Sequence, residues 1–466
     1  MHLIQTLNGI FWGWLIAGIL VGVGIFLTIR LKFPQIRYFK KIFTNLKDSM
    51  KSEGGVSGFG ALCSAIGSQV GTGSLVGVAT ALASGGPGAI FWMWITALLG
   101  MPISFTEAVL AQLFREKNSD GTYRGGPAYY MKKGLNSKIL PILFSISVMI
   151  GIGFFYAMIQ SNSISLALTG VVSIEPLLAG IILLILVVLV IFGGIKRLSD
   201  ICSFVVPFMA VGYLLIAIII IVLNIKILPG MIALIFKSAF AFKSVAGGVA
   251  GYTVKEAFRY GVARGLFSND AGNGTTPSMH ATAVVKHPVN QGFSAMIGTF
   301  IATIIICSCT AFCILLTGAL DTNVTGIELT QVAFSNALGG AGKFVVFLAM
   351  FLFGFTTLLA DIYYGEVNLM YLVKENKKVV LAYRLICCAM IIIGAVAPAA
   401  IVWDLVDFSV AFMVFFNVIA LLGLSKYVTY VLKDYVGQRN KGKEQPIWNY
   451  EKDVTKMNLN KLSDEQ

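Results

Sequence analysis

The stretch GGVSGFGALCSAIGSQVGTGSLVGVATALASGGPGAIFWMW (residues 54–94) decides the fold, and no charged residue follows it until after Thr106. A helix that crosses a bilayer needs about 20 apolar residues and has to satisfy its backbone polar groups internally. Small residues stand here where Leu or Ile would be expected, at Gly67, Gly71, Gly73 and Gly77. The pattern predicts a membrane span that is interrupted near its own centre.

Two interpretations of these glycines compete. Each Gly inside a helix costs about 1 kcal/mol relative to Ala, so the glycines need a physical reason. In one interpretation they let neighbouring helices approach closely, as small residues at a spacing of four do in membranes. In the other, the helix unwinds at residues 70–74 and offers backbone N–H and C=O groups to a ligand at mid-membrane. The segment alone does not separate the two.

The whole chain has the composition of a polytopic membrane protein, with 57% apolar and 12% charged residues. No soluble domain is needed to account for it. The seven cysteines lie in apolar segments and are interpreted as buried hydrophobic side chains, not as disulfides or metal ligands. The net charge of +13 raises nucleic acid or anionic lipid as a partner, so the placement of the charges has to decide.

Uncharged apolar runs mark ten predicted spans. They cover residues 10–29, two spans within 54–106 separated by the turn 84–88, and residues 139–174, 176–195, 201–225, 291–320, 344–360, 385–403 and 408–425. An eleventh candidate at 247–285 is masked by its charges. The candidate carries Lys255, Glu256, Arg259, Arg264 and Asp270.

The distribution of Lys and Arg decides whether the eleventh segment crosses. With eleven crossings and the N-terminus outside, 28 of the 35 Lys and Arg fall on the cytoplasmic side. This is a strong positive-inside bias, and removing the eleventh span would place the basic C-terminal tail outside. The charge is therefore interpreted as a topology signal, with no nucleic acid as partner and the C-terminus inside.

An internal repeat relates the two halves. Gly71-Thr72-Gly73-Ser74 followed by Ala-Thr-Ala is echoed by Gly272-Asn273-Gly274-Thr275 followed by Ala-Thr-Ala. Five spans begin at each copy, and an odd number of spans inverts the second copy in the membrane. The predicted organisation is an extra helix (8–30), a basic cytoplasmic linker (31–53), a first repeat (54–225), an extracytoplasmic connection (226–245), a second repeat (246–425) and a polar cytoplasmic tail (426–466). Chance similarity of two Gly-rich tracts is the alternative. Paired, Gly-interrupted spans in inverted halves favour a secondary transporter.

Several motifs resemble the alanine/glycine:cation symporter family, also called the sodium:alanine symporters. They are residues 71–101, RGGPAYYM (124–131), VPFMAVGYLL (206–215), YGVARGLFSNDAGNGTTP (260–277), HPVNQG (287–292) and YYGE (363–366). The resemblance runs from about residue 54 to 425. It implies an all-α, LeuT-like five-plus-five inverted repeat with one additional N-terminal helix, in the cell membrane of a prokaryote. The implied function is sodium-coupled symport of a small amino acid, with Na⁺ as the co-transported ion.

The sequence departs from the family at three places. Ser74 stands where the family has Asn in GTGN, and Asp270 where it has Glu in FSNEAG. Two positions before YYGE, Asp361 replaces a usual Trp. These changes lie where ligand is expected, so the substrate is alanine or glycine, or a larger or more polar amino acid.

The substrate site is expected at the two unwound segments. N–H groups of Gly71, Thr72, Gly73 and Ser74 begin a half-helix whose positive end favours a carboxylate. A second break at Phe267, Ser268 and Asn269 is expected to leave carbonyls free for the ammonium group. The resemblance adds Gln160, and a face shared with Thr357 adds Asp361. Asn162 is expected to bond to a neighbouring helix instead.

The sodium site follows from the resemblance. It implies ligands at the carbonyls of Gly67 and Val70 and at the hydroxyls of Thr356 and Thr357. Adjacent threonines inside a helix can instead bond back to their own carbonyls. Glu107 and the acids 404 and 407 are interpreted as structural, and a proton relay through His280 and His287 is disfavoured.

Other classes of protein and other couplings remain as alternatives. A proton-coupled transporter of the same fold is one, and a channel, whose glycine tracts would line a filter, is a less favoured one. An enzyme is not expected, since no nucleophile–base pair or metal constellation is visible. The identity of the amino acid, the stoichiometry and the oligomeric state stay open.

Overall fold

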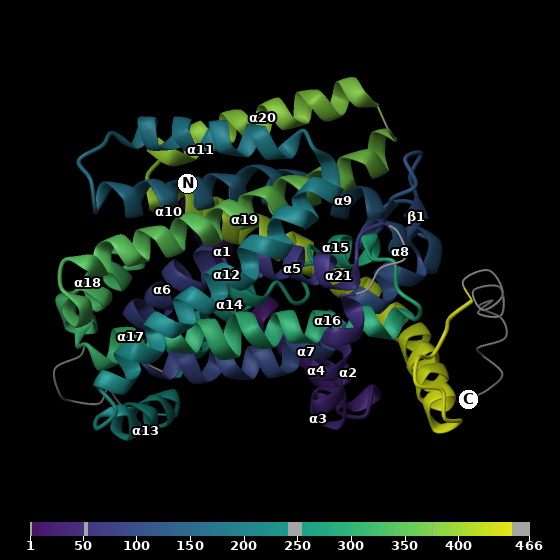
Figure 1. Cartoon of the computed structure of the whole chain (residues 1–466), viewed down its shortest axis with the longest axis horizontal. Coiled ribbons are helices and arrows are strands. Elements are labelled where there is room, and N and C mark those ends of the chain that lie inside the picture. The colour runs from purple at the N-terminus through teal and green to yellow at the C-terminus, as the bar shows by residue number, and fades with distance from the viewer. Residues whose placement is uncertain (1, 51–54, 241–253, 375, 450–466) are drawn as a thin grey trace.

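The computed structural model describes residues 2–50, 55–240, 254–374 and 376–449, and this part of the chain is almost wholly helical (Figure 1). One short hairpin interrupts the helices, with β1 (Glu116–Lys117) antiparallel to β2 (Tyr123–Arg124). The elements labelled η1 to η4 are π-helical turns and η5 is a 3₁₀ turn. The described part of the chain thus has the predicted all-α fold, apart from this hairpin.

The helices of the first half are α1 (His2–Ile10), η1 (Phe11–Leu15), α2 (Ile16–Arg30), α3 (Pro34–Arg37), α4 (Phe39–Ser49), α5 (Gly58–Gln69), η2 (Gly73–Gly77), α6 (Val78–Gly85), α7 (Gly88–Leu113), α8 (Pro127–Gly134), α9 (Leu140–Ile150), η3 (Gly151–Tyr156), α10 (Ala157–Thr169), α11 (Pro176–Ile191), α12 (Gly194–Leu223) and α13 (Leu228–Ala239). Those of the second half are α14 (Val254–Asn269), α15 (Pro277–Thr282), α16 (Pro288–Thr299), η4 (Phe300–Cys307), α17 (Ser308–Leu316), η5 (Ala319–Thr322), α18 (Gly326–Leu338), α19 (Ala341–Val373), α20 (Lys377–Val396) and α21 (Ala399–Asn440).

The described residues contain 7 helices that are long and apolar enough to cross a membrane, or up to 8 with the bent pair Gly58–Gln69 and Gly73–Gly85. Several outward side chains on these helices are large and apolar. On α12, Phe204 is 77% and Phe208 67% exposed. Such a surface suits hydrocarbon, because the exposed side chains are apolar and most backbone polar groups of a helix are paired within it. The membrane-spanning character is confirmed, whereas the count of eleven spans stays a prediction.

The two ends of the molecule differ in composition. Helices α6, α13, α17 and α18 lie at one end (Figure 1), and α6 and α18 also line a vestibule described below. Helices α3, α4 and α8 and the β1–β2 hairpin lie at the other. We call the end that contains α3, α4, α8 and the hairpin the basic end, because its segments carry basic side chains such as Lys117, Lys132 and Lys133.

Several predicted boundaries are wrong. The penultimate span was expected to end at Trp403, but α20 ends at Val396 and α21 already begins at Ala399. Pro398 explains the break, since it has no N–H to continue a helical ladder. Helix α21 contains two acidic residues, at positions 404 and 407. Residues of other helices form hydrogen bonds or an ion pair with these carboxylates. Helix α12 begins at Gly194 instead of residue 201, and the expected connection 226–245 contains α13.

Candidate functional site

The first interrupted helix unwinds where its glycines predict, but over fewer residues. Helix α5 ends at Gln69, and only residues 70–72 lie outside helical elements before η2 begins at Gly73. The two halves meet at an angle of 46°. Gly73 and Ser74, which were expected to be unwound, are instead part of the wide π-helical turn. The sequence analysis made the unwound segment too long, because a π-helical turn has no sequence signature of its own.

The second interrupted helix breaks later than predicted. Helix α14 continues through Phe267 and Ser268 to Asn269, and the break spans residues 270–276 before α15 starts at Pro277. The Asp270 N–H still donates to Leu266 O at 2.9 Å, which completes the last helical turn. Positive φ angles at Asp270, Gly272 and Gly274 then turn the chain. Two of these three are glycines, the residues that adopt this conformation without strain.

The two interrupted helices cross each other closely beside their breaks. A Cβ atom built on Gly73 would lie 2.9 Å from Phe267 Cδ1 and 3.0 Å from Ser268 Cα. One built on Gly71 would lie 2.3 Å from the Thr357 hydroxyl of α19. These glycines therefore allow backbone to approach backbone and a hydroxyl. Close packing at these glycines and the interruption of the helix are both observed, whereas the binding of a ligand by the unwound backbone stays a prediction.

Gln160 meets the first break. Its Oε1 accepts from the Thr72 N–H at 3.2 Å and from the Thr72 hydroxyl. The Gln160 side-chain oxygen therefore pairs with the two donors of Thr72, which were expected to be free at the start of the half-helix. Its neighbour on α10, Asn162, bonds to the carbonyls of Gly394 and Ala397, as expected for an amide that ties two helices together.

Two hydroxyls and a carbonyl converge just before the first break. Thr357 Oγ1 lies 2.7 Å and Thr356 Oγ1 3.3 Å from the Gly67 carbonyl oxygen. Both hydroxyls also lie close to Phe353 O, at 2.9 and 3.0 Å, so each retains a bond to its own helix. Val70 caps α5 with non-helical dihedral angles, and its carbonyl is no longer aligned with the helix. The hydroxyls of Thr356 and Thr357 and the Gly67 carbonyl thus gather between α5 and α19.

Several polar groups beside the two breaks have partners on neighbouring elements. Gln69 Nε2 donates to Asn269 O at 2.7 Å, so this carbonyl, expected to be free, has a partner. Ser268 Oγ lies 2.9 Å from Cys307 Sγ of η4. The Ser74 carbonyl accepts from Thr310 at 2.8 Å. Of the predicted set, Ser74, Ser268 and Asn269 therefore help to join the breaks to their neighbours.

Asp361 lies in the same buried region. It is 1% exposed, and its Oδ2 has no hydrogen-bond partner. The nearest interacting charge is Asp270, whose two carboxylate oxygens accept from Ser68 at 3.0 Å and Asn273 at 2.9 Å. A buried carboxylate oxygen without a partner carries a desolvation cost, so a ligand or proton that meets it is strongly favoured.

Glu107 was interpreted as structural from its place at the end of a span, and the structure shows where it acts. It is fully buried on α7, and its two oxygens accept from the N–H groups of Gly272 at 3.2 Å and Gly274 at 3.1 Å. Asn417 of α21 donates to the same carboxylate at 2.6 Å and to Gly272 O at 3.0 Å. Glu107 thereby holds the second break open. The signal in the sequence was a carboxylate inside an otherwise apolar helix.

We expect Glu107→Gln to impair transport. A glutamine accepts with one oxygen only, so it leaves the N–H of Gly272 or Gly274 unpaired, at about 1–3 kcal/mol. We predict that transport falls about tenfold and that the melting temperature drops. Glu116→Gln is the matched control, because Glu116 pairs with Lys133 near the surface. Equal transport by both variants would show that Glu107 does not position the break.

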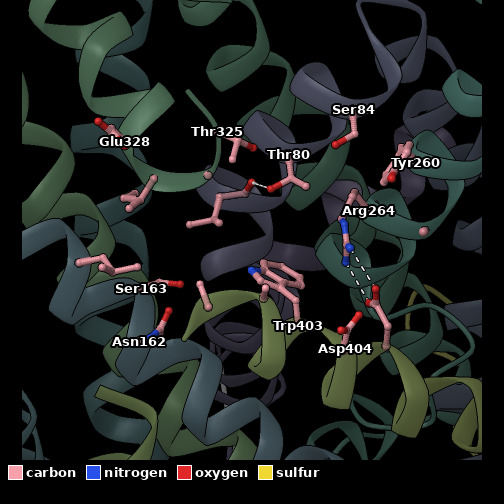
Figure 2. A pocket seen from close by; sticks show the side chains of 18 of the residues that line it. Thr80, Ser84, Asn162, Ser163, Tyr260, Arg264, Thr325, Glu328, Trp403 and Asp404 are labelled. Carbon is pink, nitrogen blue, oxygen red and sulfur yellow. Dashed lines mark hydrogen bonds and ion pairs between the residues drawn. The ribbon is translucent and has the colours of Figure 1, made fainter. Parts of the chain in front are cut away.

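A vestibule of about 880 Å³ lies between elements of both halves of the chain (Figure 2). Asn162 and Ser163 line one side, and Trp403, Asp404 and Arg264 line another. Its lining comes from α1, α6, α10, α14, α18, α19 and α21, so both halves of the chain contribute.

Aromatic rings separate this vestibule from the breaks. The Phe267 ring centroid lies 4.9 Å from that of Trp403 and 4.9 Å from that of Tyr156. Arg264 covers Trp403 at 4.3 Å and forms a two-point ion pair with Asp407, at 2.9 and 3.0 Å. Phe267 belongs to this aromatic layer, and its closing over a ligand stays a prediction. Sequence reasoning missed Tyr156, Arg264, Trp403 and Asp407 as its members.

His280 and His287 contact different partners. His280 Nδ1 pairs with Gln291 at 2.7 Å, and His287 Nε2 with Asp434 at 3.2 Å. Each imidazole thus has a separate partner near the basic end.

Solved structures with a similar fold come from secondary transporters. MhsT, solved in complex with L-phenylalanine, matches with a TM-score of 0.58 at 13% identity, over 79% of this chain and 88% of MhsT. The manganese transporter of Eremococcus coleocola matches with a TM-score of 0.51 at 17% identity, over 87% of this chain and 83% of the transporter. Two interrupted helices that cross below a vestibule are typical of this class. The chain therefore shares the LeuT-like fold of these transporters.

The sequence comparisons are more specific. The profile of the sodium:alanine symporter family matches residues 1–449, and the chain belongs to this family. The sodium/alanine symporter AgcS of Methanococcus maripaludis is 38% identical over 442 residues, 92% of this chain and 95% of AgcS. GlnT of Bacillus subtilis, described as a probable sodium/glutamine symporter, is 41% identical over 458 residues, 98% of this chain and 94% of GlnT.

Proposed function

We propose that this transporter couples the entry of Na⁺ to the uptake of a small amino acid by alternating access. The observation that carries the proposal is the crossing of the two breaks next to the Gly67, Thr356 and Thr357 oxygens. Neutral oxygens from an unwound helix and a facing helix are what a Na⁺ ion requires in such folds. The sodium/alanine symporter AgcS among its relatives supports the same assignment.

The substrate carboxylate would replace the Gln160 side-chain oxygen. Gln160 Oε1 accepts from two donors of Thr72, which is the bonding that a carboxylate oxygen takes at the start of a half-helix. We propose that Gly71, Thr72, Gly73 and Ser74 bind the carboxylate when Gln160 turns to the rest of the ligand. The Phe267 carbonyl faces Gly73. We propose that this carbonyl and the neighbouring Ser268 carbonyl accept from the ammonium group.

The sodium ion would bind between α5 and α19. We assign its ligands to the carbonyls of Gly67 and Val70 and to the hydroxyls of Thr356 and Thr357. The hydroxyl protons now donate to carbonyls, and they would turn away when the cation takes up the oxygen lone pairs. Because Gly67 and Thr72 flank one break, a bound cation would fix the backbone that binds the substrate. This contact is the physical basis proposed for coupling.

The arrangement in the membrane follows from charge. We propose eleven spans, including the short apolar helices Ile16–Arg30 and Pro176–Ile191, in two inverted five-helix repeats. The basic end would face the cytoplasm, and the vestibule would face outside. The location would be the cell membrane of a prokaryote.

Asp361 would set the substrate or the coupling ion. It lies one helical turn after Thr357, near Asp270, with an oxygen that no described residue pairs. A substrate side chain with a hydrogen-bond donor, as in glutamine, would pair that oxygen, and GlnT among the relatives supports this choice. A proton on Asp361 would also satisfy it, which is the basis of the proton-coupled alternative.

We predict that Asp361→Asn alters either the amino-acid preference or the sodium or pH dependence of uptake. Asp361→Trp is expected to shift preference toward alanine and glycine, since the ring fills space and removes the acid. The measurement is competition of labelled alanine uptake by a panel that includes glycine, serine and glutamine. If Asp361→Asn keeps the parent's preference and both dependences, the acid is structural and the substrate is a small neutral amino acid.

The assignment as a whole is tested by binding. The purified protein is titrated with alanine, glycine, serine and glutamine, with sodium or with choline, and thermal stabilisation is recorded. We expect at least one amino acid to stabilise the protein strongly only when sodium is present. Equal stabilisation in choline would contradict sodium coupling, and stabilisation by none of the panel would contradict the substrate class.

A further inference from the structure

The chain returns on itself after its last helix. Beyond Asn440, residues 441–449 are mainly exposed, but Pro446 and Trp448 are buried. Trp448 is 4% exposed, which is unusual for a side chain of such a polar segment. We call residues 445–448 the C-terminal clasp. Burial of a large ring at the end of an exposed segment indicates that the segment is docked and has a specific site.

One side of the clasp rests on the link between α15 and α16. The backbone N–H of Trp448 donates to Lys286 O at 2.8 Å. The centroid of the Trp448 ring lies 5.5 Å from the centroid of the His287 ring. Lys286 Nζ donates to Gln445 Oε1 at 2.6 Å. His287 is fully buried beneath this contact. The clasp therefore covers the segment that follows the second interrupted helix.

The other side of the clasp is fixed to α21. Gln438 Nε2 donates to Ile447 O at 2.9 Å, and the Ile447 N–H donates to Gln438 Oε1 at 3.0 Å. One amide side chain thus pairs both backbone groups of Ile447. Arg439 donates to the Glu444 carbonyl beside it. The clasp is a bridge between α21 and the α15–α16 link.

The link under the clasp also ties the two interrupted helices together. The Val284 N–H donates to Val56 O at 3.0 Å, and Val56 and Ala283 form a β-bridge. Val56 stands two residues before α5, and Ala283 directly follows α15. A cavity of about 630 Å³ borders this junction and is lined by Val284, Lys286, Gln445 and Pro446. Any opening at the basic end has to separate these elements.

We propose that the C-terminal clasp holds the basic end closed and has to undock before that end opens. The proposal rests on the alternating access proposed above. In a bistable transporter, contacts made in one state only shift the population toward that state. The bonds of the clasp join α21 to the junction of the interrupted helices, so they belong to the closed basic end. Trp448 and Gln438 are its positioning residues, and they touch no predicted substrate or sodium ligand.

The test measures opening away from the clasp. Ser278 on α15 is buried, and its hydroxyl packs against Gly126, so Ser278→Cys reports separation of α15 from the α8 region. The full-length protein in lipid nanodiscs is labelled with a polar maleimide without sodium or substrate. The parent without this cysteine gives the background from the seven native cysteines. Trp448→Ala is expected to raise the labelling rate about tenfold, as a closed population is lost.

Ile447→Ala is the matched control, because that side chain is 60% exposed while its backbone makes the same bonds. It should label at the parent rate. If Trp448→Ala does not fold, Gln438→Ala carries the same expectation of faster labelling. Labelling of the Trp448 or Gln438 variant at the parent rate would overturn the clasp. Because labelling needs neither substrate nor a gradient, that result would leave the proposed symport standing.

Discussion

Replacing Gly73 with Val is expected to abolish amino-acid binding while the protein still inserts and folds. A Cβ at this position would lie 2.9 Å from Phe267 Cδ1, 3.0 Å from Ser268 Cα and 3.2 Å from Phe267 O. Two of these three atoms are backbone, which cannot turn aside as a flexible side chain does. Forced overlap costs about 1–3 kcal/mol, or about tenfold or more in affinity. Binding is measured by thermal stabilisation or equilibrium dialysis with saturating sodium.

Gly77→Ala provides the control for Gly73→Val. Gly77 belongs to the same π-helical turn, and a Cβ there would meet only Thr72 O at 4.0 Å. It should bind the amino acid as the parent does. Normal binding by the Gly73 variant would mean that the crossing of the two breaks is not the substrate site.

Replacing Thr357 with Ala is expected to weaken the sodium dependence of uptake far more than amino-acid recognition at saturating sodium. The hydroxyl lies 2.7 Å from the Gly67 carbonyl, so its loss removes one oxygen from the proposed cation site. A bond between a charged and a polar group contributes about 1.5–3 kcal/mol, which predicts a rise of about tenfold or more in half-saturating sodium. The measurement is a sodium titration of uptake.

Thr317→Ala is the control for Thr357→Ala. Thr317, the C-cap of α17, donates back to Cys313 O at 2.7 Å, which is the same type of bond that Thr357 makes to Phe353 O. Its replacement should leave the sodium titration unchanged. An unchanged half-saturating sodium concentration in Thr357→Ala would remove this residue from the sodium site.

The interrupted helices were predictable because Gly is visible in a sequence. The glycines at 71 and 73 and at 272 and 274 mark both breaks within a few residues. Their edges were not predictable, because contacts distant in sequence set them. Gln69 binds the Asn269 carbonyl from the other half of the chain, and the Leu266 carbonyl keeps the last turn of α14 intact.

Two further parts of the site show the same limit. Gln160 was assigned through a resemblance, and only the structure shows that its oxygen meets the donors of Thr72. Glu107 was visible as an acid in an apolar helix, but its partners lie more than a hundred residues away. Trp448 gave a weak signal as a lone large ring in a polar tail. The local sequence shows that such residues are unusual for their surroundings, and the tertiary contacts show which residues they bind.

The central claim is coupling, and concentrative uptake tests it most directly. The protein is reconstituted into proteoliposomes, and labelled amino acid, chosen as the best binder of the panel, is supplied outside with an inward sodium gradient. We predict that the internal concentration rises above the external one, and that replacing sodium with choline removes this accumulation. Entry that stops at equal concentrations would indicate a channel or an uncoupled carrier. Accumulation in choline under a proton gradient would contradict sodium as the driving ion.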